Sequence, residues 1–338
     1  MTNKKITIRE VATQAGVSIS TVSQYMNKRF DYMGTETRKR IESAIRELDY
    51  QPNVVARSLK VKNTRTIGIV VANILHNFST EVIRAIEDEC HNQGFSTIIC
   101  NADDEPEKER KYLNTLLSKQ VDGLILFPTG GNIEIHQKLA DESFPMVFID
   151  RIIKEMTVDS VLLDNHRAID VAVEHLIENG YERIAILTSS LLQNVTPRIE
   201  RIEGFQMAMK NRGLPMHPEY VKGMEIKDLN RGLKRLYSLK QPPDAFIAGN
   251  DLTLMEILKF ASEEGKQIGR EMGLVTIDEV DFAKVYAPPL STIAQPTFEM
   301  GRQAASLLLN KVRGDVAEPP RIHRYAPQLN ARASSRKH

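Results

Sequence analysis

Three side chains near the N-terminus have the types and the spacing to read DNA bases. Ile19, Ser20 and Gln24 fall on the exposed face of a predicted short helix. A glutamine amide can form two hydrogen bonds with adenine, and an isoleucine side chain offers apolar contact to a thymine methyl group. Three neighbouring hydroxyl residues also fit a second interpretation, as helix caps and polar surface groups: Ser18, Thr21 and Ser23.

The residues around this helix predict a helix-turn-helix. A first helix begins at its N-cap, Thr7, and Glu10 three residues later completes a capping box. Gly16 ends it, because glycine adopts the left-handed conformation that a sharp reversal requires. A second helix is expected from its N-cap Ser18 to about Asn27. In such a motif the second helix enters the DNA major groove.

Two further segments follow the helix-turn-helix. A third helix is predicted up to Leu48, with three basic residues, 38–40, that can meet phosphates. Pro52 closes this region, because proline disfavours helix at the preceding residue. Asn53 is the expected cap of a short segment that ends at Leu59. So short a helix is barely stable alone, and we expect it to need a partner helix or a groove.

The formal net charge of the 338-residue chain, +1, hides an asymmetry. Residues 1–62 hold 12 Lys/Arg and six Asp/Glu, a net of +6, and the other 276 residues hold 33 and 38, a net of −5. A basic head on an acidic body is typical of a protein that binds nucleic acid or another anionic surface. The alternative interpretation is a solvated, lysine-rich terminus.

Several function classes find no support. The sequence has no G-x-G-x-x-G, P-loop, G-x-S-x-G or H-E-x-x-H motif, and its eight histidines lack metal-ligand spacing. The two cysteines cannot build a disulfide framework or a four-ligand zinc site, and no run of about 18 apolar residues occurs. We therefore expect a cytoplasmic protein that is not an enzyme, with no metal, cofactor or membrane partner. The alternative is a sugar-binding receptor or an enzyme that does not act on DNA.

Beyond residue 63, short β-type runs alternate with helical stretches. This alternation predicts open, mainly parallel sheets that are covered on both faces. Its length suggests two similar halves that divide near Asp164. Strand candidates include 66–71, 96–100, 122–127, 146–149, 160–163, 183–187, 245–248 and 273–277, and helical stretches lie between them, for example at 80–93, 108–119, 167–179, 199–211 and 253–264.

Several segments, taken in order, resemble the lactose/galactose repressor (LacI/GalR) family. In the head they are Ile8-Arg9-Glu10-Val11-Ala12, Ala15-Gly16-Val17-Ser18, Arg38-Lys39-Arg40-Ile41, Leu48-Asp49-Tyr50-Gln51-Pro52-Asn53 and Ala56-Arg57-Ser58-Leu59. In the body they are Ile67-Gly68-Ile69-Val70, Val121-Asp122-Gly123-Leu124-Ile125, Phe148-Ile149-Asp150-Arg151, Arg201-x-x-Gly204-Phe205, Ala248-Gly249-Asn250-Asp251 and Leu290-Ser291-Thr292-Ile293.

The resemblance implies an all-α helix-turn-helix headpiece on an α/β core of two Rossmann-like subdomains of the periplasmic-binding-protein type I. The expected divisions are a headpiece at 1–52, a hinge helix and linker at 53–63, a first subdomain at 64–164 plus about 296–322, a second at 165–295 plus about 323–330, and a polar tail at 331–338. The tail lacks a leucine heptad, so we expect a dimer.

The resemblance implies a homodimeric transcriptional regulator, a repressor, that binds a palindromic operator. Leu59 matches the leucine that wedges between base steps in the minor groove, although interdomain packing is an alternative. The stretch 28–34 looks one residue longer than in the lactose repressor, so its contacts are not transferred. The implied DNA-binding residues are Thr7, Ser18, Ile19, Ser20, Thr21, Gln24, Asn27, Asn53, Ala56 and Leu59.

A small-molecule effector is expected between the subdomains, beyond the carboxyl ends of the strands. Carboxylates and amides there suit vicinal hydroxyls, and two arginines suit a carboxylate or phosphate. For Arg151 an internal salt bridge to Asp150 or Asp278 is the alternative. Within the family the chain most resembles regulators of 2-keto-3-deoxygluconate (kdg) metabolism, which favours a sugar acid. The implied effector-binding residues are Phe78, Asp150, Arg151, Arg201, Asn250, Asp278 and Gln295.

Overall fold

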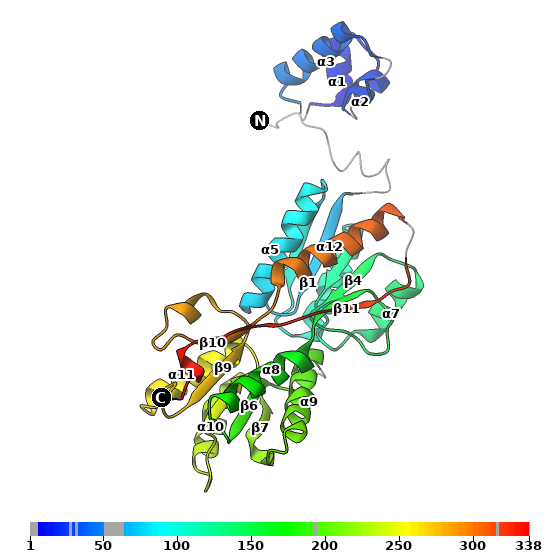
Figure 1. Cartoon of the computed structure of the whole chain (residues 1–338). Coiled ribbons are helices and arrows are strands. Elements are labelled where there is room, and N and C mark those ends of the chain that lie inside the picture. Colours follow the sequence, from blue (N-terminus) through cyan, green and yellow to red (C-terminus); the bar gives the residue numbers. More distant parts are fainter. Residues whose placement is uncertain are drawn as a thin grey trace. The chain divides into compact units, whose positions relative to one another are not determined.

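The computed structural model describes residues 6–26, 29–30, 33–50, 64–191, 195–315 and 318–337, which fall into two units divided at Thr64. The first unit contains three helices, α1 (Ile8–Ala15), α2 (Ile19–Met26) and α3 (Thr35–Glu47) (Figure 1). Their fully buried side chains form a small shared core of Val11, Val22 and Ile41. The three-helix headpiece thus has its own apolar interior.

The start of α1 and the turn between α1 and α2 have the predicted local chemistry. The Glu10 carboxylate accepts hydrogen bonds from the backbone N–H of Thr7 (2.6 Å) and from its hydroxyl (3.0 Å). Gly16 has φ +61°, the left-handed conformation that ends the helix without strain. Ser18 Oγ then accepts from the backbone N–H of Thr21 at 3.1 Å and caps α2.

The second unit contains two six-stranded sheets, each forming one lobe. The first sheet has the order β11-β5-β4-β3-β1-β2, and all of its strand pairs are parallel. Its strands are β1 (Thr66–Val71), β2 (Ser96–Asn101), β3 (Gly123–Leu126), β4 (Met146–Ile149), β5 (Ser160–Leu163) and β11 (Ile322–Tyr325). We call the part of the chain around this sheet the first lobe.

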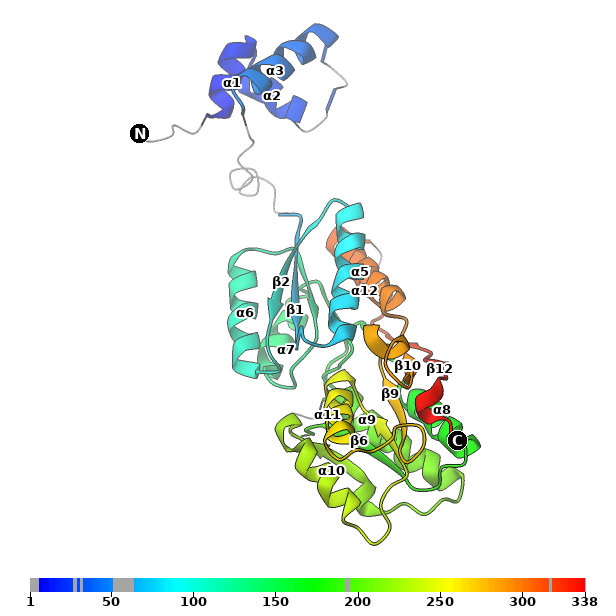
Figure 2. The same ribbon diagram turned by 90° about the vertical axis from the view of Figure 1, so that its left-hand side faces the viewer.

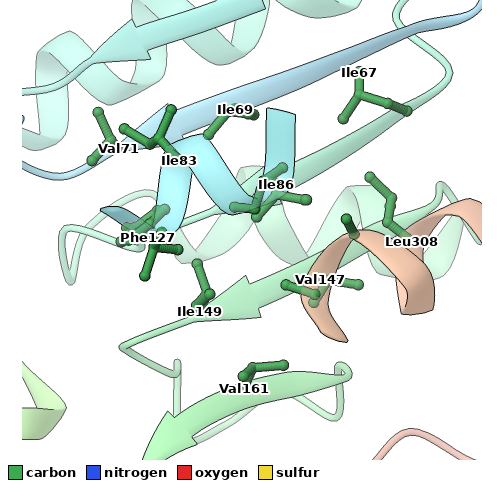
Figure 3. Packing of buried hydrophobic residues seen from close by; sticks show 14 of the residues in the cluster. Ile67, Ile69, Val71, Ile83, Ile86, Phe127, Val147, Ile149, Val161 and Leu308 are labelled. Atoms are coloured by element: carbon green, nitrogen blue, oxygen red, sulfur yellow. The ribbon is translucent and has the colours of Figure 1, made fainter. Parts of the chain in front are cut away.

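Helices cover both faces of this first sheet (Figure 2). Alternate residues of each strand point to opposite faces. On one face, side chains such as Ile69 and Val147 pack against α5 (Asn77–Asn92) and α12 (Thr297–Arg313), as Figure 3 shows. On the other face, Val70 and Phe148 pack against α6 (Pro106–Ser118) and α7 (Ile133–Asp141).

The second lobe repeats this arrangement. Its sheet has the order β12-β10-β9-β8-β6-β7, and only β12 is antiparallel to its neighbour. The strands are β6 (Ile184–Ser189), β7 (Val221–Met224), β8 (Ala245–Ala248), β9 (Gly273–Ile277), β10 (Ser291–Ala294) and β12 (Gln328–Asn330). Helices α8 (Asn165–Glu178) and α9 (Thr196–Asn211) cover one face, and α10 (Leu229–Tyr237) and α11 (Asp251–Glu263) the other.

The chain passes between the lobes three times. It leaves the first sheet after β5, returns between β10 and α12, and crosses again between β11 and β12. The last crossing lies later than the expected boundary at 322/323, because residues 322–325 pair with β5 as a parallel strand of the first sheet. That assignment of 323–325 to the second subdomain was wrong.

The segment 331–338 is polar as predicted, but residues 332–337 do not extend away from the core. Ser334 and Ser335 are fully buried in a short 3-10 turn, Ala333–Ser335. The Ser334 hydroxyl donates to the Leu274 carbonyl at 2.7 Å and accepts from the Ser291 N–H at 2.7 Å. Composition alone did not reveal this docking, because each serine is satisfied by partners far away in the sequence.

Candidate functional site

The headpiece presents the predicted base-reading residues on the outer side of α2. Ile19 is 42% exposed, although it is a large apolar residue, and Ser20 and Gln24 are also exposed. The hydroxyls of Ser20 and Thr21 lie 2.6 and 2.8 Å from Ser18 Oγ. These contacts support the interpretation that the hydroxyls organise the start of α2, and base reading by Ser20 and Thr21 stays a prediction.

The remaining predicted DNA-binding residues divide into two groups. Thr7 is exposed and forms the N-cap of α1. The others lie outside the described residues: Asn27, Asn53, Ala56 and Leu59.

All seven predicted effector residues line one cavity between the two lobes. Its free volume is about 40 Å³. Three of the seven follow a strand directly: Asp150 after β4, Asp278 after β9 and Gln295 after β10. Because the carboxyl ends of parallel strands share one edge of a sheet, both lobes direct these residues to the cleft. The remaining four are Phe78, Arg151, Arg201 and Asn250.

Arg151 is held on the first-lobe side by two carboxylates. Its Nη1 donates to Asp104 Oδ1 at 2.7 Å, and its Nε donates to Asp150 Oδ2 at 3.2 Å. Burial lowers the pKa of the Arg151 guanidinium, but the two aspartates more than offset this, so the pKa is raised. The internal salt bridge to Asp150, the alternative interpretation, is present; Asp104 is a second, unpredicted partner.

Arg201 has no carboxylate partner among the described residues. Its Nε donates to Asn165 Oδ1 at 2.9 Å, and its Nη1 donates to the Gly249 carbonyl. The side chain is buried, with the residue only 5% exposed. These neutral acceptors orient the guanidinium, whose positive charge also acts on the carboxyl of Asp278.

Asp278 lines the same cavity as Arg201 and is hydrogen-bonded to Gln295, whose Nε2 donates to Asp278 Oδ1 at 2.6 Å. Burial raises the pKa of Asp278 from its ordinary 3.8 to about 6, although Arg201 acts in the opposite direction. Both Asp278 (φ +81°) and Asp150 (φ +67°) adopt the left-handed conformation, which aspartate tolerates better than most residues. Each lobe thus places an aspartate in the same way after its strand.

Asn250 and Phe78 shape the remaining cavity wall. The Asn250 side chain caps α11 by accepting from the Thr253 N–H at 2.8 Å, and it donates to Ser189 Oγ at 3.0 Å. The Phe78 ring packs edge-on against Phe127, with centroids 6.5 Å apart. These contacts supply one fixed amide and an apolar surface, a combination that suits the two sides of a sugar ring.

Three titratable residues at the cavity were not predicted: His76, Arg198 and Asp104. The first two line the cavity, and Asp104 bonds to its arginines. His76 Nδ1 lies 2.5 Å from Asp251 Oδ1 of the second lobe. The only sequence signal for Arg198 was its spacing, one helical turn before Arg201. This spacing does not distinguish a cavity residue from an arginine on a helix surface. The partners that distinguish these residues lie on the opposite lobe, where local sequence gives no indication.

Arg201 is also connected to the segments that cross between the lobes. Its partner Asn165, just after the first crossing, donates to Glu200 Oε2 at 2.9 Å. Glu200 in turn accepts two bonds from Arg324 of β11, at 2.6 and 3.0 Å. A ligand that moves the Arg201 guanidinium therefore acts on a continuous polar network that reaches the last crossing.

Several charged groups of the cleft are engaged in hydrogen bonds with one another or with an amide, Arg151 with Asp104 and Asp150, and Asp278 with Gln295. Within the described ranges, no group of three or more His, Cys, Asp or Glu side chains is placed to hold a metal ion. Among the same residues, no helix has the length and apolar character needed to cross a membrane.

Comparison with known proteins agrees with this architecture over nearly the whole chain. The family model "Periplasmic binding proteins and sugar binding domain of LacI family" matches residues 64–329. The model "Bacterial regulatory proteins, lacI family" matches residues 7–53. The first match covers the two-lobed core, and the second covers the helix-turn-helix.

Two curated relatives and one solved structure span the chain. The "Probable HTH-type transcriptional regulator EndR" of Paenibacillus polymyxa is 43% identical over 332 residues, 97% of this chain and 98% of that protein. The HTH-type transcriptional regulator KdgR of Bacillus subtilis (strain 168) is 35% identical over 338 residues, 98% and 97% of the two chains. The lac repressor dimer bound to operator and the anti-inducer ONPF shares the fold, with a TM-score of 0.85 at 22% identity over 98% and 100% of the chains.

These matches confirm the family resemblance, the fold class and the expectation that the protein is not an enzyme. KdgR among the relatives also agrees with the kdg-like resemblance. The chain belongs to the LacI family of bacterial regulatory proteins and is a helix-turn-helix transcriptional regulator.

Proposed function

We propose that this protein is an operator-binding repressor whose affinity for DNA is controlled by a carboxylated sugar bound between the lobes. The observation that carries the effector class is the convergence of three guanidinium groups, of Arg151, Arg198 and Arg201, on one cavity. A guanidinium fork pairs best with a carboxylate or a phosphate. Asp150, Asn250 and Asp278 surround the same space with groups that bind hydroxyls. Together with the resemblance to kdg regulators, these groups make 2-keto-3-deoxygluconate the first candidate for the effector.

The DNA-binding half of the proposal rests on the exposed face of α2. Gln24, Ser20 and Ile19 supply two polar groups and one apolar group for the base edges of a major groove. The basic charge of residues 1–62 attracts the phosphate backbone and makes binding salt-dependent. A homodimer would place two such helices on the halves of a palindromic operator in the cytoplasm.

Leu59 is the proposed minor-groove wedge. An apolar side chain inserted between base steps unstacks them and bends the duplex. Leu59→Ala should weaken operator binding and reduce DNA bending, while effector affinity stays unchanged. Electrophoretic phasing with a bent-DNA standard measures the bend angle. Equal bending by Leu59→Ala and the parent protein would reject the wedge.

A gel-shift series tests the proposal as a whole. The purified protein is titrated against fragments of its own genomic neighbourhood, with and without 2-keto-3-deoxygluconate, D-gluconate, a sugar phosphate and neutral sugars. We expect one palindromic fragment to bind specifically and an acidic sugar to change that binding. A response to sugar phosphates alone would move the effector to that class. Sugar binding without binding to any fragment would favour a receptor without operator function.

A further inference from the structure

Asp104 occupies a position in the cleft that its local sequence does not suggest. Its carboxylate accepts a hydrogen bond from Nη1 of Arg151, a first-lobe residue, at 2.7 Å, and it lies 3.5 Å from Nη2 of Arg198 in the second lobe. Asp104 follows β2 and precedes α6, so it belongs to the first lobe. One internal carboxylate thus joins two arginines across the cleft that we propose for the effector.

The backbone directs Asp104 toward this cleft. Its φ of +57° is left-handed, and its N–H donates to the carbonyl of Ala72, itself a cavity residue, at 2.6 Å. Asp103, the preceding residue, has a similar φ of +52° but a different environment, because its carboxylate pairs with Lys108 and its side chain is 42% exposed. The two aspartates are adjacent in sequence, and only the second is turned toward the guanidinium groups.

The two arginines beside Asp104 differ in how well their charges are compensated. Arg151 has two carboxylate partners, whereas the described partners of Arg198 are the longer contact to Asp104 and the Ser190 carbonyl, to which its Nη1 donates at 2.9 Å. Burial and the neighbouring Arg151 lower the pKa of Arg198, the direction expected of a cation with insufficient counter-charge. A second anion next to Arg198 would therefore be favourable.

We propose that Asp104 is a specificity-determining residue that stands in for the carboxylate of the effector. In the structure, Asp104 bridges Arg151 and Arg198. An anionic effector replaces Asp104 as the ion-pair partner of Arg198, while Arg151 remains paired with Asp104 and Asp150. A neutral sugar gains nothing from this exchange, so it does not replace the contact between the lobes. The inference rests on the proposed function and adds a cause for the selection of acids over neutral sugars.

Charge removal at Asp104 tests the exchange through the sign of its effect. Asp104→Asn keeps the size of the side chain but removes the competing charge. Isothermal titration of the full-length protein would measure binding of 2-keto-3-deoxygluconate and D-gluconate, each beside its neutral carboxamide. We expect Asp104→Asn to bind the acids about tenfold more tightly and the carboxamides within about twofold of the parent.

Asp103→Asn is the matched control, because it removes the same charge from the adjacent residue outside the cleft. It should leave the affinity for acids and carboxamides at the parent level. Arg198→Gln should reduce the preference for acid over carboxamide by at least about tenfold. Circular dichroism and thermal unfolding verify that each variant is folded before its titration is interpreted.

Two results would overturn the exchange in different ways. If the parent binds an acid and Asp104→Asn binds it equally well or more weakly, Asp104 positions Arg151 and does not compete with the effector. If the parent shows no preference for the acids over their carboxamides, the acidic effector under the proposed function is wrong, and the exchange is wrong with it. Tighter binding of both acids and carboxamides by Asp104→Asn would also contradict the exchange, because charge would not be the cause.

Discussion

Replacement of Arg201 by alanine should separate effector binding from DNA binding. The guanidinium donates to Asn165 Oδ1 and to the Gly249 carbonyl, and its residue is 5% exposed. Loss of these donors leaves two acceptors in a buried site, which should lower the unfolding free energy of the core by about 2 to 4 kcal/mol. Loss of a charge-assisted bond to a bound carboxylate costs about 2 to 4 kcal/mol, or roughly 30- to 1,000-fold in Kd.

Three measurements distinguish these effects. Calorimetric titration gives the effector Kd, thermal unfolding gives the loss of core stability, and fluorescence anisotropy gives operator affinity without effector. Arg201→Lys is the matched variant: it keeps the charge but cannot form the same fork, so its Kd should lie between those of the parent and Arg201→Ala. A folded Arg201→Ala protein that binds 2-keto-3-deoxygluconate within threefold of the parent would refute the role of Arg201.

Three further predictions concern other parts of the molecule. The raised pKa of Asp278 means that this carboxyl binds a proton more tightly in the folded state than in the unfolded state, so it lowers the unfolding free energy as pH rises from about 4 to 6. The stability gained by Asp278→Asn, measured by urea titration, should therefore grow over that pH window. A difference that stays constant with pH would contradict this prediction. A Cβ on Gly301 would lie 2.7 Å from Ala85 Cβ, so Gly301→Ala should lower the free energy of unfolding by about 1 to 3 kcal/mol. An unchanged urea midpoint would be inconsistent with the close contact of α5 and α12. Gln24→Ala should weaken operator binding by about 1 to 3 kcal/mol and relax one base preference, as measured by binding to an operator library; retained preference at every position would exclude base reading by Gln24.

Local sequence predicted the elements whose apolar pattern was strong. Strands such as β1 and β4 are buried on both faces, so they appear as nearly continuous apolar runs with bounds that match the structure. The edge strand β7, Val221–Met224, was missed because it contains Lys222 and Gly223 and is only partly buried. Helices α7 (Ile133–Asp141), α10 (Leu229–Tyr237) and α12 (Thr297–Arg313) were not among the helical stretches given as examples.

The cavity was predictable where position along a strand determined it. Asp150, Asp278 and Gln295 follow strand ends, and the family resemblance pointed to the same residues. Arg198 and Asp104 were missed for a physical reason: their interaction joins residues 94 positions apart on opposite lobes. A single sequence shows neither partner of such an ion pair as unusual.

Coupling between the two sites is the most direct test of an effector-controlled operator-binding protein. If 2-keto-3-deoxygluconate changes the operator Kd by a given factor, then operator DNA must change the Kd for this sugar by the same factor. Anisotropy with labelled operator and calorimetry with saturating operator measure the two sides of this cycle on the same full-length protein. We predict equal factors of at least about fivefold, typical of an allosteric coupling, and a factor near one for the neutral carboxamide. An operator Kd that is unchanged at saturating 2-keto-3-deoxygluconate would contradict control of DNA binding by this sugar acid.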